Sequence, residues 1–447
     1  MNNQPGTAGA ARNVYPAAGY AWYMVILLTL AYICSFIDRY MLGLLVEPIK
    51  ADLNLTDTQL GLLLGPAFAI FYATMGLPLG WLADRRRRTW IVAAGITIWS
   101  AATIACGLVK NFFQMFIARM SVGIGEATLS PCAISMISDS FPRERRAKPI
   151  AFYTMAVSIG AALASLFSAT VLVWAKSNPG MSLPLVGPIA AWQLAFIAVG
   201  LPGFMLAVLF FVLREPKRQE MSAAKGLGNA TLLDTLKFIH ARWKTFACFL
   251  SIFCLMTTIA YSQGWCAALF MRTWGWEASK YALVNGIVLL AVGPATVNLS
   301  GWLCDRWYNR GVADAALRIA VIGAFIMVIT GVIAPLMPGG GSAMLMFGVN
   351  AIGLAMITAT GVTALLNLAP GQIRAQIVAF YYMAISLTGL LLGPTTVGIF
   401  TDQFFGEQNL KYSLALLPLI YGLPVLLLVP VTLRTYARTC AEIQRGE

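Results

Sequence analysis

Charged residues are scarce in this chain of 447 amino acids, and their scarcity excludes most soluble folds. Asp, Glu, Lys and Arg together make up 11% of the sequence, whereas a soluble globular domain contains about 25%. Hydrophobic residues make up 59%, and the mean hydropathy is +0.75. A chain this apolar cannot cover its surface with groups that water solvates. The composition therefore predicts a protein embedded in a lipid bilayer.

Residues that build enzyme centres are also rare. The sequence has a single histidine, His240, and its eight cysteines include no C-x-x-C pair, so neither a metal site nor a disulfide framework is indicated. Gly123-x-Gly125 lies within an apolar helical segment, where it indicates packing and not a dinucleotide-binding turn. We expect no cofactor, no metal and no enzymatic activity. The alternative left open is a membrane-embedded enzyme that uses the carboxyl groups of Asp38 and Glu126.

Twelve apolar segments are each long enough to cross about 30 Å of hydrocarbon as a helix, which takes about 20 residues. We place them at 21–46, 58–82, 90–109, 112–137, 150–174, 190–213, 245–270, 280–303, 315–337, 342–368, 375–400 and 413–433. The predicted fold class is an all-α polytopic membrane protein with two six-helix bundles. Its expected parts are an N-terminal tail (1–20), a first bundle (21–213), a linker (214–244), a second bundle (245–433) and a C-terminal tail (434–447).

The basic residues are distributed unequally between the two sides of this arrangement. If the N-terminus is cytoplasmic, most of the 31 Lys and Arg residues fall in inside segments. The outside segments contain Lys50, Lys110, Lys176, Arg272, Lys280 and Lys411. Because Lys and Arg collect in cytoplasmic loops, we expect both termini in the cytoplasm and the protein in the cytoplasmic (inner) membrane. The net charge of +13 then reflects topology, and we expect no nucleic-acid partner.

Two short motifs occur once in each half of the chain. "GWLADR" (80–85) follows the second apolar segment and "GWLCDR" (301–306) follows the eighth. "PRERRAKPIAFY" (142–153) and "PGQIRAQIVAFY" (370–381) share Pro, Arg-Ala and Ala-Phe-Tyr at a similar offset. This pattern indicates two parallel repeats related by an axis along the membrane normal. Such repeats predict a binding site between the two halves.

These residues resemble a known family. Gly80-x-x-x-Asp84-Arg85-x-x-Arg88 is similar to the signature loop of the major facilitator superfamily, and Arg119-x-x-x-Gly123-x-Gly125 is similar to its second motif. The segment 119–153, together with Asp38-Arg39, resembles the Spinster-like branch. Two features depart from the superfamily: Arg87 replaces a common loop glycine, and the fifth segment lacks the Gly-Pro element of many proton-driven drug antiporters.

The resemblance implies the fold of the superfamily and a monomeric secondary transporter that works by alternating access. It also implies a lipid-like or amphipathic cargo, with organic acids as the alternative. A facilitative uniporter of the same fold stays open, because the second departure leaves the direction of coupling undetermined.

Four ionisable residues lie well inside the predicted helices: Asp38, Arg39, Arg119 and Glu126. A charge near the middle of a membrane helix costs about 2.5–3.5 kcal/mol on insertion scales, so each needs a partner, water or a proton. Asp38 and Arg119 lie at the same depth, which predicts an ion pair. Glu126 follows Arg119 by about two turns and shares its face near the midplane. We expect Asp38, Arg119 and Glu126 to couple transport to protons, with Arg119 and Glu126 contacting the substrate and Arg39 contacting either the substrate or a neighbouring helix. A structural ion pair is the alternative for these residues.

The second half has no ionisable residue deep in a predicted helix, so its polar uncharged residues are the candidates for substrate contact. They are, together with Tyr153 of the first half, Tyr261, Gln263, Asn285, Asn350, Tyr381 and Tyr382. Taken one at a time, each Asn or Tyr is expected to form an interhelical hydrogen bond rather than a ligand contact; taken together, they suggest an amphipathic substrate. The cytoplasmic loops supply a candidate gate, in which Asp84 holds the halves together in the outward-open state. Its residues are Gly80, Asp84, Arg85, Arg88, Arg146, Asp305, Arg306 and Arg374.

Overall fold

The computed structural model of the protein describes residues 15–142, 145, 147–177, 182–183, 187–218, 232–369 and 373–445. Within these residues, twelve helical spans are long and apolar enough to cross a membrane, with mean hydropathies of 1.2 to 2.5. The predicted all-α fold with twelve membrane helices is confirmed. The short strands β1 (Ser182–Leu183) and β2 (Gly187–Pro188) pair antiparallel between the fifth and sixth spans.

The first six spans form one bundle. Its helices are α1 (Ala18–Leu44), α2 (Val46–Leu53), α3 (Asp57–Leu64), α4 (Pro66–Arg85), α5 (Arg88–Cys106), α6 (Phe112–Glu126), α7 (Leu129–Ser140), α8 (Ala147–Thr154), α9 (Ala156–Ser177) and α10 (Ala191–Val212).

The linker and the last six spans follow. They comprise α12 (Leu232–Ala241), α13 (Trp243–Ser262), η2 (Gln263–Trp265), α14 (Cys266–Trp274), α15 (Ala278–Tyr308), α16 (Ala315–Ile333), η3 (Ala334–Leu336), α17 (Gly340–Asn367), α18 (Arg374–Phe400), η4 (Thr401–Phe405), η5 (Glu407–Asn409) and α19 (Leu410–Arg445).

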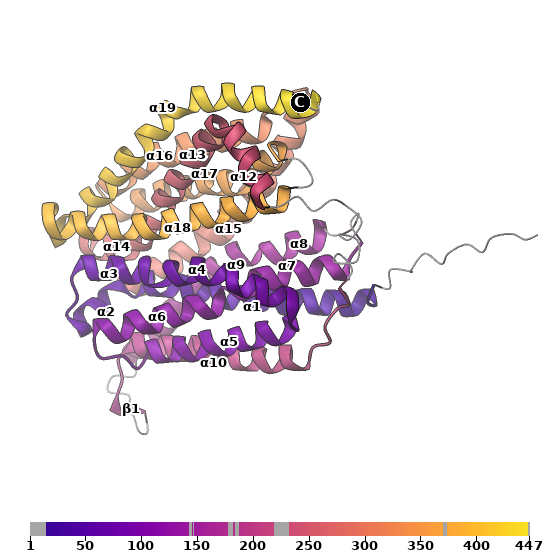
Figure 1. Cartoon of the computed structure of the whole chain (residues 1–447). Coiled ribbons are helices and arrows are strands. Elements are labelled where there is room, and N and C mark those ends of the chain that lie inside the picture. The colour runs from indigo at the N-terminus through magenta and orange to yellow at the C-terminus, as the bar shows by residue number, and fades with distance from the viewer. Residues whose placement is uncertain are drawn as a thin grey trace, which may run out of the picture.

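The two bundles lie side by side with their helices roughly parallel (Figure 1). They meet mainly where α9 packs on α15 and where α3 and α4 pack on α18. The start of α1 and the end of α19 lie at the same end of the molecule, as an even number of spans requires. We call this end cytoplasmic, following the distribution of basic residues, and the opposite end outer.

Several spans are broken where the sequence interrupts the backbone hydrogen-bond ladder. The second span breaks at Gly65, and Pro66 begins α4 at a position that needs no amide hydrogen. The fourth span breaks after Glu126, and Pro131 near the start of α7 has no amide hydrogen for the carbonyl of Ala127. The break places the end of α6, and therefore Glu126, in the middle of the span.

The described residues of the linker and of the C-terminal segment pack on the bundles. Arg218 donates to the carbonyls of Ala83 (2.7 Å) and Arg86 (2.6 Å), so the first linker residues bind the end of α4. Helix α19 continues to Arg445, through most of the residues expected to form a tail. There Thr245 and Thr439 hydroxyls lie 2.9 Å apart, which joins this extension to α13.

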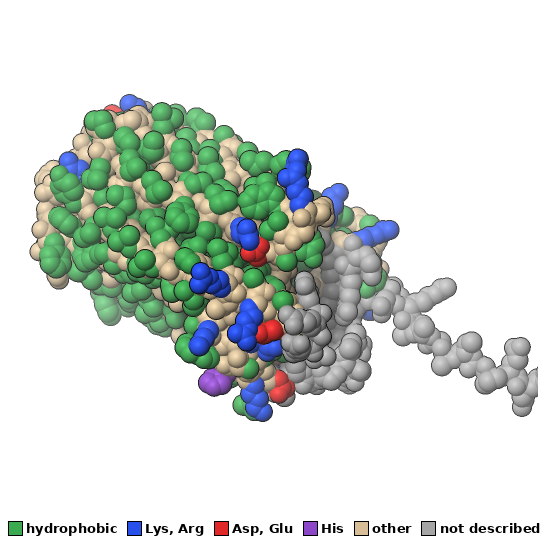
Figure 2. Space-filling model, turned by 90° about the horizontal axis from the view of Figure 1, so that it is seen from above, with side chains coloured by type: hydrophobic (Ala, Val, Ile, Leu, Met, Phe, Trp, Pro, Cys, Tyr) green, Lys and Arg blue, Asp and Glu red, His purple; other side chains and the backbone are tan. Residues whose placement is uncertain are grey.

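The lateral surface is apolar. Large side chains such as Met205, Val212, Leu345 and Leu427 are more than 70% exposed, and Figure 2 shows hydrophobic side chains over most of the visible face. Lys and Arg side chains gather toward one end of that face. An apolar belt of this extent is the surface that lipid tails solvate.

Candidate substrate and proton site

Adjacent residues Asp38 and Arg39 on α1 point to different partners, as the 100° rotation between neighbouring helix positions requires. The Asp38 side chain is buried, and Thr103 of α5 donates to its Oδ2 at 2.7 Å. Arg119 of α6 approaches Oδ1 with Nη1 at 3.3 Å. The ion pair expected between Asp38 and Arg119 is therefore present in the structure.

Arg39 points across the bundle to Glu126. Its Nε donates to Glu126 Oε2 at 2.5 Å. Its guanidinium also lies over the rings of Phe68 and Tyr72, each 4.5 Å from the ring centre, and 5.0 Å from that of Phe36. The negative faces of aromatic rings attract a cation. Arg39 is thus held by one carboxylate and three rings.

Glu126 uses only one of its two carboxyl oxygens. Oε2 accepts hydrogen bonds from Arg39 and from Ser35 Oγ, the latter at 2.6 Å. Oε1 is buried, and within the described ranges of the chain it has no hydrogen-bond partner. Buried polar atoms are rarely left unpaired in folded proteins, so this oxygen is available to a proton.

The sequence predicted the face and depth of Glu126 but no partner for it. Seven residues separate Glu126 from Arg119 on one helix face, which amounts to about 10 Å along the axis and is too far for direct contact. Arg39 enters from α1, and it is the residue that pairs with Glu126.

Tyrosines from both bundles surround this centre. The rings of Tyr32 and Tyr153 stack at 4.6 Å, and the Tyr153 hydroxyl lies 3.4 Å from Ser130 Oγ. From the second bundle, Tyr261 packs on the core of the first and lies near Arg39. Tyr382 lies near Tyr32. Of the predicted substrate residues, Tyr153, Tyr261 and Tyr382 therefore lie closest to the charged centre.

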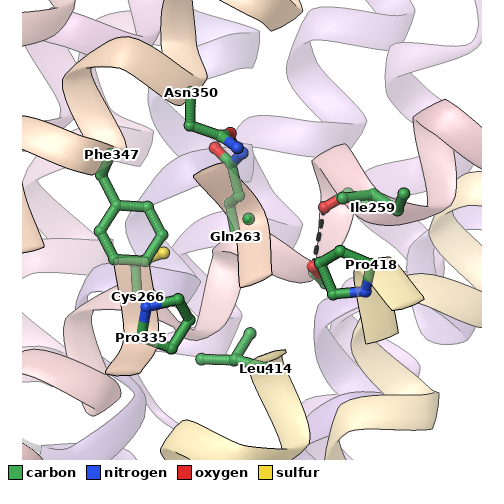
Figure 3. A pocket seen from close by; sticks show the side chains of 10 residues that line it. Ile259, Gln263, Cys266, Pro335, Phe347, Asn350, Leu414 and Pro418 are labelled. Atoms are coloured by element: carbon green, nitrogen blue, oxygen red, sulfur yellow. Dashed lines mark hydrogen bonds between the residues drawn. The ribbon is translucent and has the colours of Figure 1, made fainter. Parts of the chain in front are cut away.

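Gln263 and Asn350 lie inside the second bundle (Figure 3). Gln263 Nε2 donates to Asn350 Oδ1 at 2.5 Å, and Asn350 Nδ2 donates to the Met327 carbonyl and to Thr330 Oγ1, both at 2.9 Å. The cavity beside them has a volume of about 20 Å³, enough for about one water molecule. Both amides thus form interhelical hydrogen bonds here, as the sequence favoured for Asn350 taken by itself.

The other two candidates of the second half also have structural partners. Asn285 Nδ2 donates to Ser165 Oγ at 3.1 Å and so joins α15 to α9 across the two bundles. Tyr381 is buried and its ring packs on Phe253 at 5.6 Å within the second bundle. Neither contact involves the charged centre.

Only part of the candidate gate in the cytoplasmic loops lies within the residues that the structure describes. A side chain at Gly80 or at Gly301 would meet open space. Arg88 is buried and binds Asp139 (2.5 Å) and Glu215 (2.8 Å), which lie in the first bundle and the start of the linker. The other described side chains, Arg85, Asp305 and Arg306, are exposed. The side chains of Asp84, Arg146 and Arg374 lie outside the described residues, and the gate stays a prediction.

Sequence reasoning missed Ser35, Thr103 and the rings of Phe36, Phe68 and Tyr72. Ser35 could have been found, because it precedes Arg39 by one helical turn on the same face. Thr103 lies in an apolar run with no pattern that marks it. The rings come from α1 and α4, and only the packing of these helices brings them around Arg39.

Residues 28–349 match the family model of the Major Facilitator Superfamily. The chain belongs to this superfamily. Among curated proteins, it is 28% identical to an MFS-type efflux pump of Mycolicibacterium smegmatis, over 89% of each chain. It is 26% identical to a probable L-galactonate transporter of Escherichia coli, over 66% of this chain and 64% of the relative. It is 25% identical to Protein spinster of Drosophila melanogaster, over 56% of this chain and 39% of that protein.

Solved structures agree with these matches. The chain resembles a bacterial homolog of the human lysosomal transporter Spinster in an inward-facing and unoccupied conformation. The TM-score is 0.78, at 25% identity, and the match covers 96% of this chain and 99% of that one. A D-xylose–proton symporter shares the fold, with a TM-score of 0.69 at 18% identity, over 91% of this chain and 97% of that one. These findings confirm a Spinster-like member of the superfamily, a multi-pass membrane transporter and not an enzyme.

Proposed function

We propose that the protein moves an organic anion across the membrane by alternating access and couples this movement to protons through Glu126. The observation that carries the proposal is the contact of Arg39 with a single oxygen of Glu126, while the other oxygen is unpaired. Arg39 is the cation best placed to bind an anionic substrate, and in this structure its guanidinium binds the carboxylate of Glu126.

The proton and the substrate are linked because both act on this ion pair. A proton on Oε1 removes the negative charge that holds Arg39, and the guanidinium can then bind the anionic group of a substrate. With Glu126 ionised, the substrate would have to displace a carboxylate in a buried site. Proton and substrate anion therefore bind in the same state, which favours cotransport over exchange.

The ion pair between Asp38 and Arg119 stabilises the geometry of the pair between Arg39 and Glu126. Asp38 accepts a hydrogen bond from Thr103 and pairs with Arg119, and Arg119 Nε has no hydrogen-bond partner among the residues that the structure describes. A change of protonation at Asp38 would release Arg119 toward the same space. We assign Asp38 and Arg119 to coupling, and Arg39 and Glu126 to both coupling and substrate binding.

The surroundings favour an anion with an apolar or ring-shaped body. Arg39 is covered by Phe36, Phe68 and Tyr72, and Tyr153, Tyr261 and Tyr382 supply further rings and hydroxyls. The relatives include a probable L-galactonate transporter and a D-galactonate transporter, and galactonate is a sugar acid. We therefore propose sugar acids and amphipathic carboxylates as substrates in preference to neutral molecules. Lipid-like acids belong in the same transport assay.

Transport into proteoliposomes tests this proposal. The panel contains galactonate, amphipathic carboxylates and lysolipids, each with and without an imposed pH gradient. We expect accumulation of an anion that depends on the gradient and is lost in Glu126→Gln, while Glu442→Gln, a matched change in the C-terminal extension, behaves as wild type. Gradient-independent equilibration of the same anion by the wild type would establish the uniporter instead.

A further inference from the structure

Charged side chains of the two bundles meet at the outer end. Among them, Glu47 of α2 and Asp57 of α3 in the first bundle bind Arg272 of α14 in the second; we call these three residues the outer latch. Lys50 of α2 also pairs with Glu407 of η5 across the same interface, at 2.9 Å. Helices α2, α3 and α14 lie together at the left of Figure 1, opposite the chain termini. The sequence did not single out these residues, and the transport site does not include them.

Arg272 binds both carboxylates with close to ideal geometry. Its Nη1 and Nη2 reach the two oxygens of Asp57 at 2.7 and 2.8 Å, and its Nε reaches Glu47 at 2.8 Å. The Asp57 side chain is fully buried and that of Arg272 is 6% exposed. Paired planar contacts of this kind are the strongest ion pairs in proteins. Removing one partner of a buried pair is costly because the other charge stays buried.

The backbones of the two bundles also lie in close contact beside the outer latch. A side chain at Gly61 would lie 2.7 Å from the carbonyl of Pro394, and one at Gly43 would lie 2.8 Å from that of Gly264. Each of these pairs joins the first bundle to the second. The outer ends are therefore sealed against each other, and a path to the outside requires the latch to open.

The latch can open without unfolding the helices that carry it. Asp402 of η4 accepts the amide hydrogens of Asp57 and Thr58 from across the interface. Thr56 and Gln59 also form a capping box at the same helix start, so α3 keeps its own cap when Asp402 withdraws. Lys50 binds Asp57 of the same bundle at 2.7 Å and Glu407 of the second bundle at 2.9 Å; when the bundles separate it loses Glu407 and remains the partner of Asp57. Arg272 is the group that loses both carboxylates.

We propose that the outer latch sets the balance between the inward-facing and outward-facing states, with Arg272 and Asp57 as its positioning residues. These residues act on the position of the bundles and do not touch the substrate. The inference rests on the alternating access of the proposed function and is independent of which substrate or ion is carried.

Hydrogen–deuterium exchange of the protein in lipid nanodiscs, without substrate, tests the latch. We expect Arg272→Gln to speed exchange roughly tenfold or more in peptides from 46–64 and 266–274, because the outward-facing population rises. Peptides at the cytoplasmic ends of α4 and α18 should become more protected. Lys280→Gln removes an outer cation that lies outside the latch and should leave both regions unchanged. Glu47→Gln removes one contact only and should give a smaller shift of the same sign.

A double variant distinguishes a specific effect of the outer latch from a general destabilisation of the protein. Because Arg272 and Asp57 act through each other, Arg272→Gln combined with Asp57→Asn should exceed the larger single effect only slightly. Faster exchange at both ends of the molecule, or additive effects of the two changes, would overturn the proposal. If Arg272→Gln does not fold, Glu47→Gln carries the test. These outcomes do not depend on transport, so failure of the latch is distinguishable from failure of proton coupling at Glu126.

Discussion

The centres of the two bundles use different chemistry for their buried polar groups. The first bundle holds two ion pairs, Asp38 with Arg119 and Arg39 with Glu126. At the comparable place the second bundle holds a neutral amide pair, Gln263 with Asn350, whose hydrogen bonds stay within that bundle. An ion pair changes when a proton binds, whereas an amide pair does not. The comparison assigns coupling to the first bundle and a rigid frame with aromatic surface to the second.

The largest effect should come from Glu126→Gln, which makes this carboxyl permanently neutral. We expect uptake driven by a pH gradient to fall at least tenfold, while exchange of substrate across the membrane without a gradient persists. The readout is the ratio of the two rates in proteoliposomes. Wild-type gradient dependence in this variant would break the assignment of coupling to the first bundle.

Arg39→Lys should give the next largest effect. Lysine keeps the charge but loses the planar group that contacts Glu126 and three rings. Loss of a hydrogen bond between charged groups costs about 1.5–3 kcal/mol, or roughly 10- to 100-fold in affinity. We expect the KM for the anionic substrate to rise by that factor. An unchanged KM would show that the substrate does not bind to Arg39.

Ser35→Ala should have a moderate effect on the pH profile. Ser35 donates to the Oε2 atom of Glu126, and this bond favours the ionised carboxylate. Without it Glu126 holds its proton to higher pH, so the midpoint of the transport profile should move upward. Ser35→Thr keeps a hydroxyl and should restore the wild-type midpoint. A uniform loss of activity at every pH would indicate a purely structural role.

Asn350→Ala should have the smallest effect on coupling, although it destabilises the second bundle. The change leaves the buried Gln263 amide without its acceptor and removes the bonds from Asn350 to the Met327 carbonyl and to Thr330, at a cost of about 1–3 kcal/mol. We expect a melting temperature lower by a few degrees and an unchanged dependence of transport on the pH gradient. Loss of that dependence would show that the second bundle also takes part in coupling.

The sequence predicted the fold because hydrophobic length and the positions of charges are local properties. It also predicted the Asp38–Arg119 pair, since depth along a helix follows from residue number. The pairing of Arg39 with Glu126 was not predictable, because it depends on the rotation of α1 against α6 and on the break after Glu126. The direction in which Gln263 and Asn350 face likewise depends on packing within the second bundle.

The most direct test of the account is to count the protons that bind with the substrate. Titration calorimetry of the purified protein with an anion that it transports, repeated in buffers of different ionisation enthalpy, gives this number. The account predicts uptake of about one proton per anion, at a pH where Glu126 is ionised in the free protein, and none in Glu126→Gln. Tight binding to the wild type with no proton uptake would contradict it.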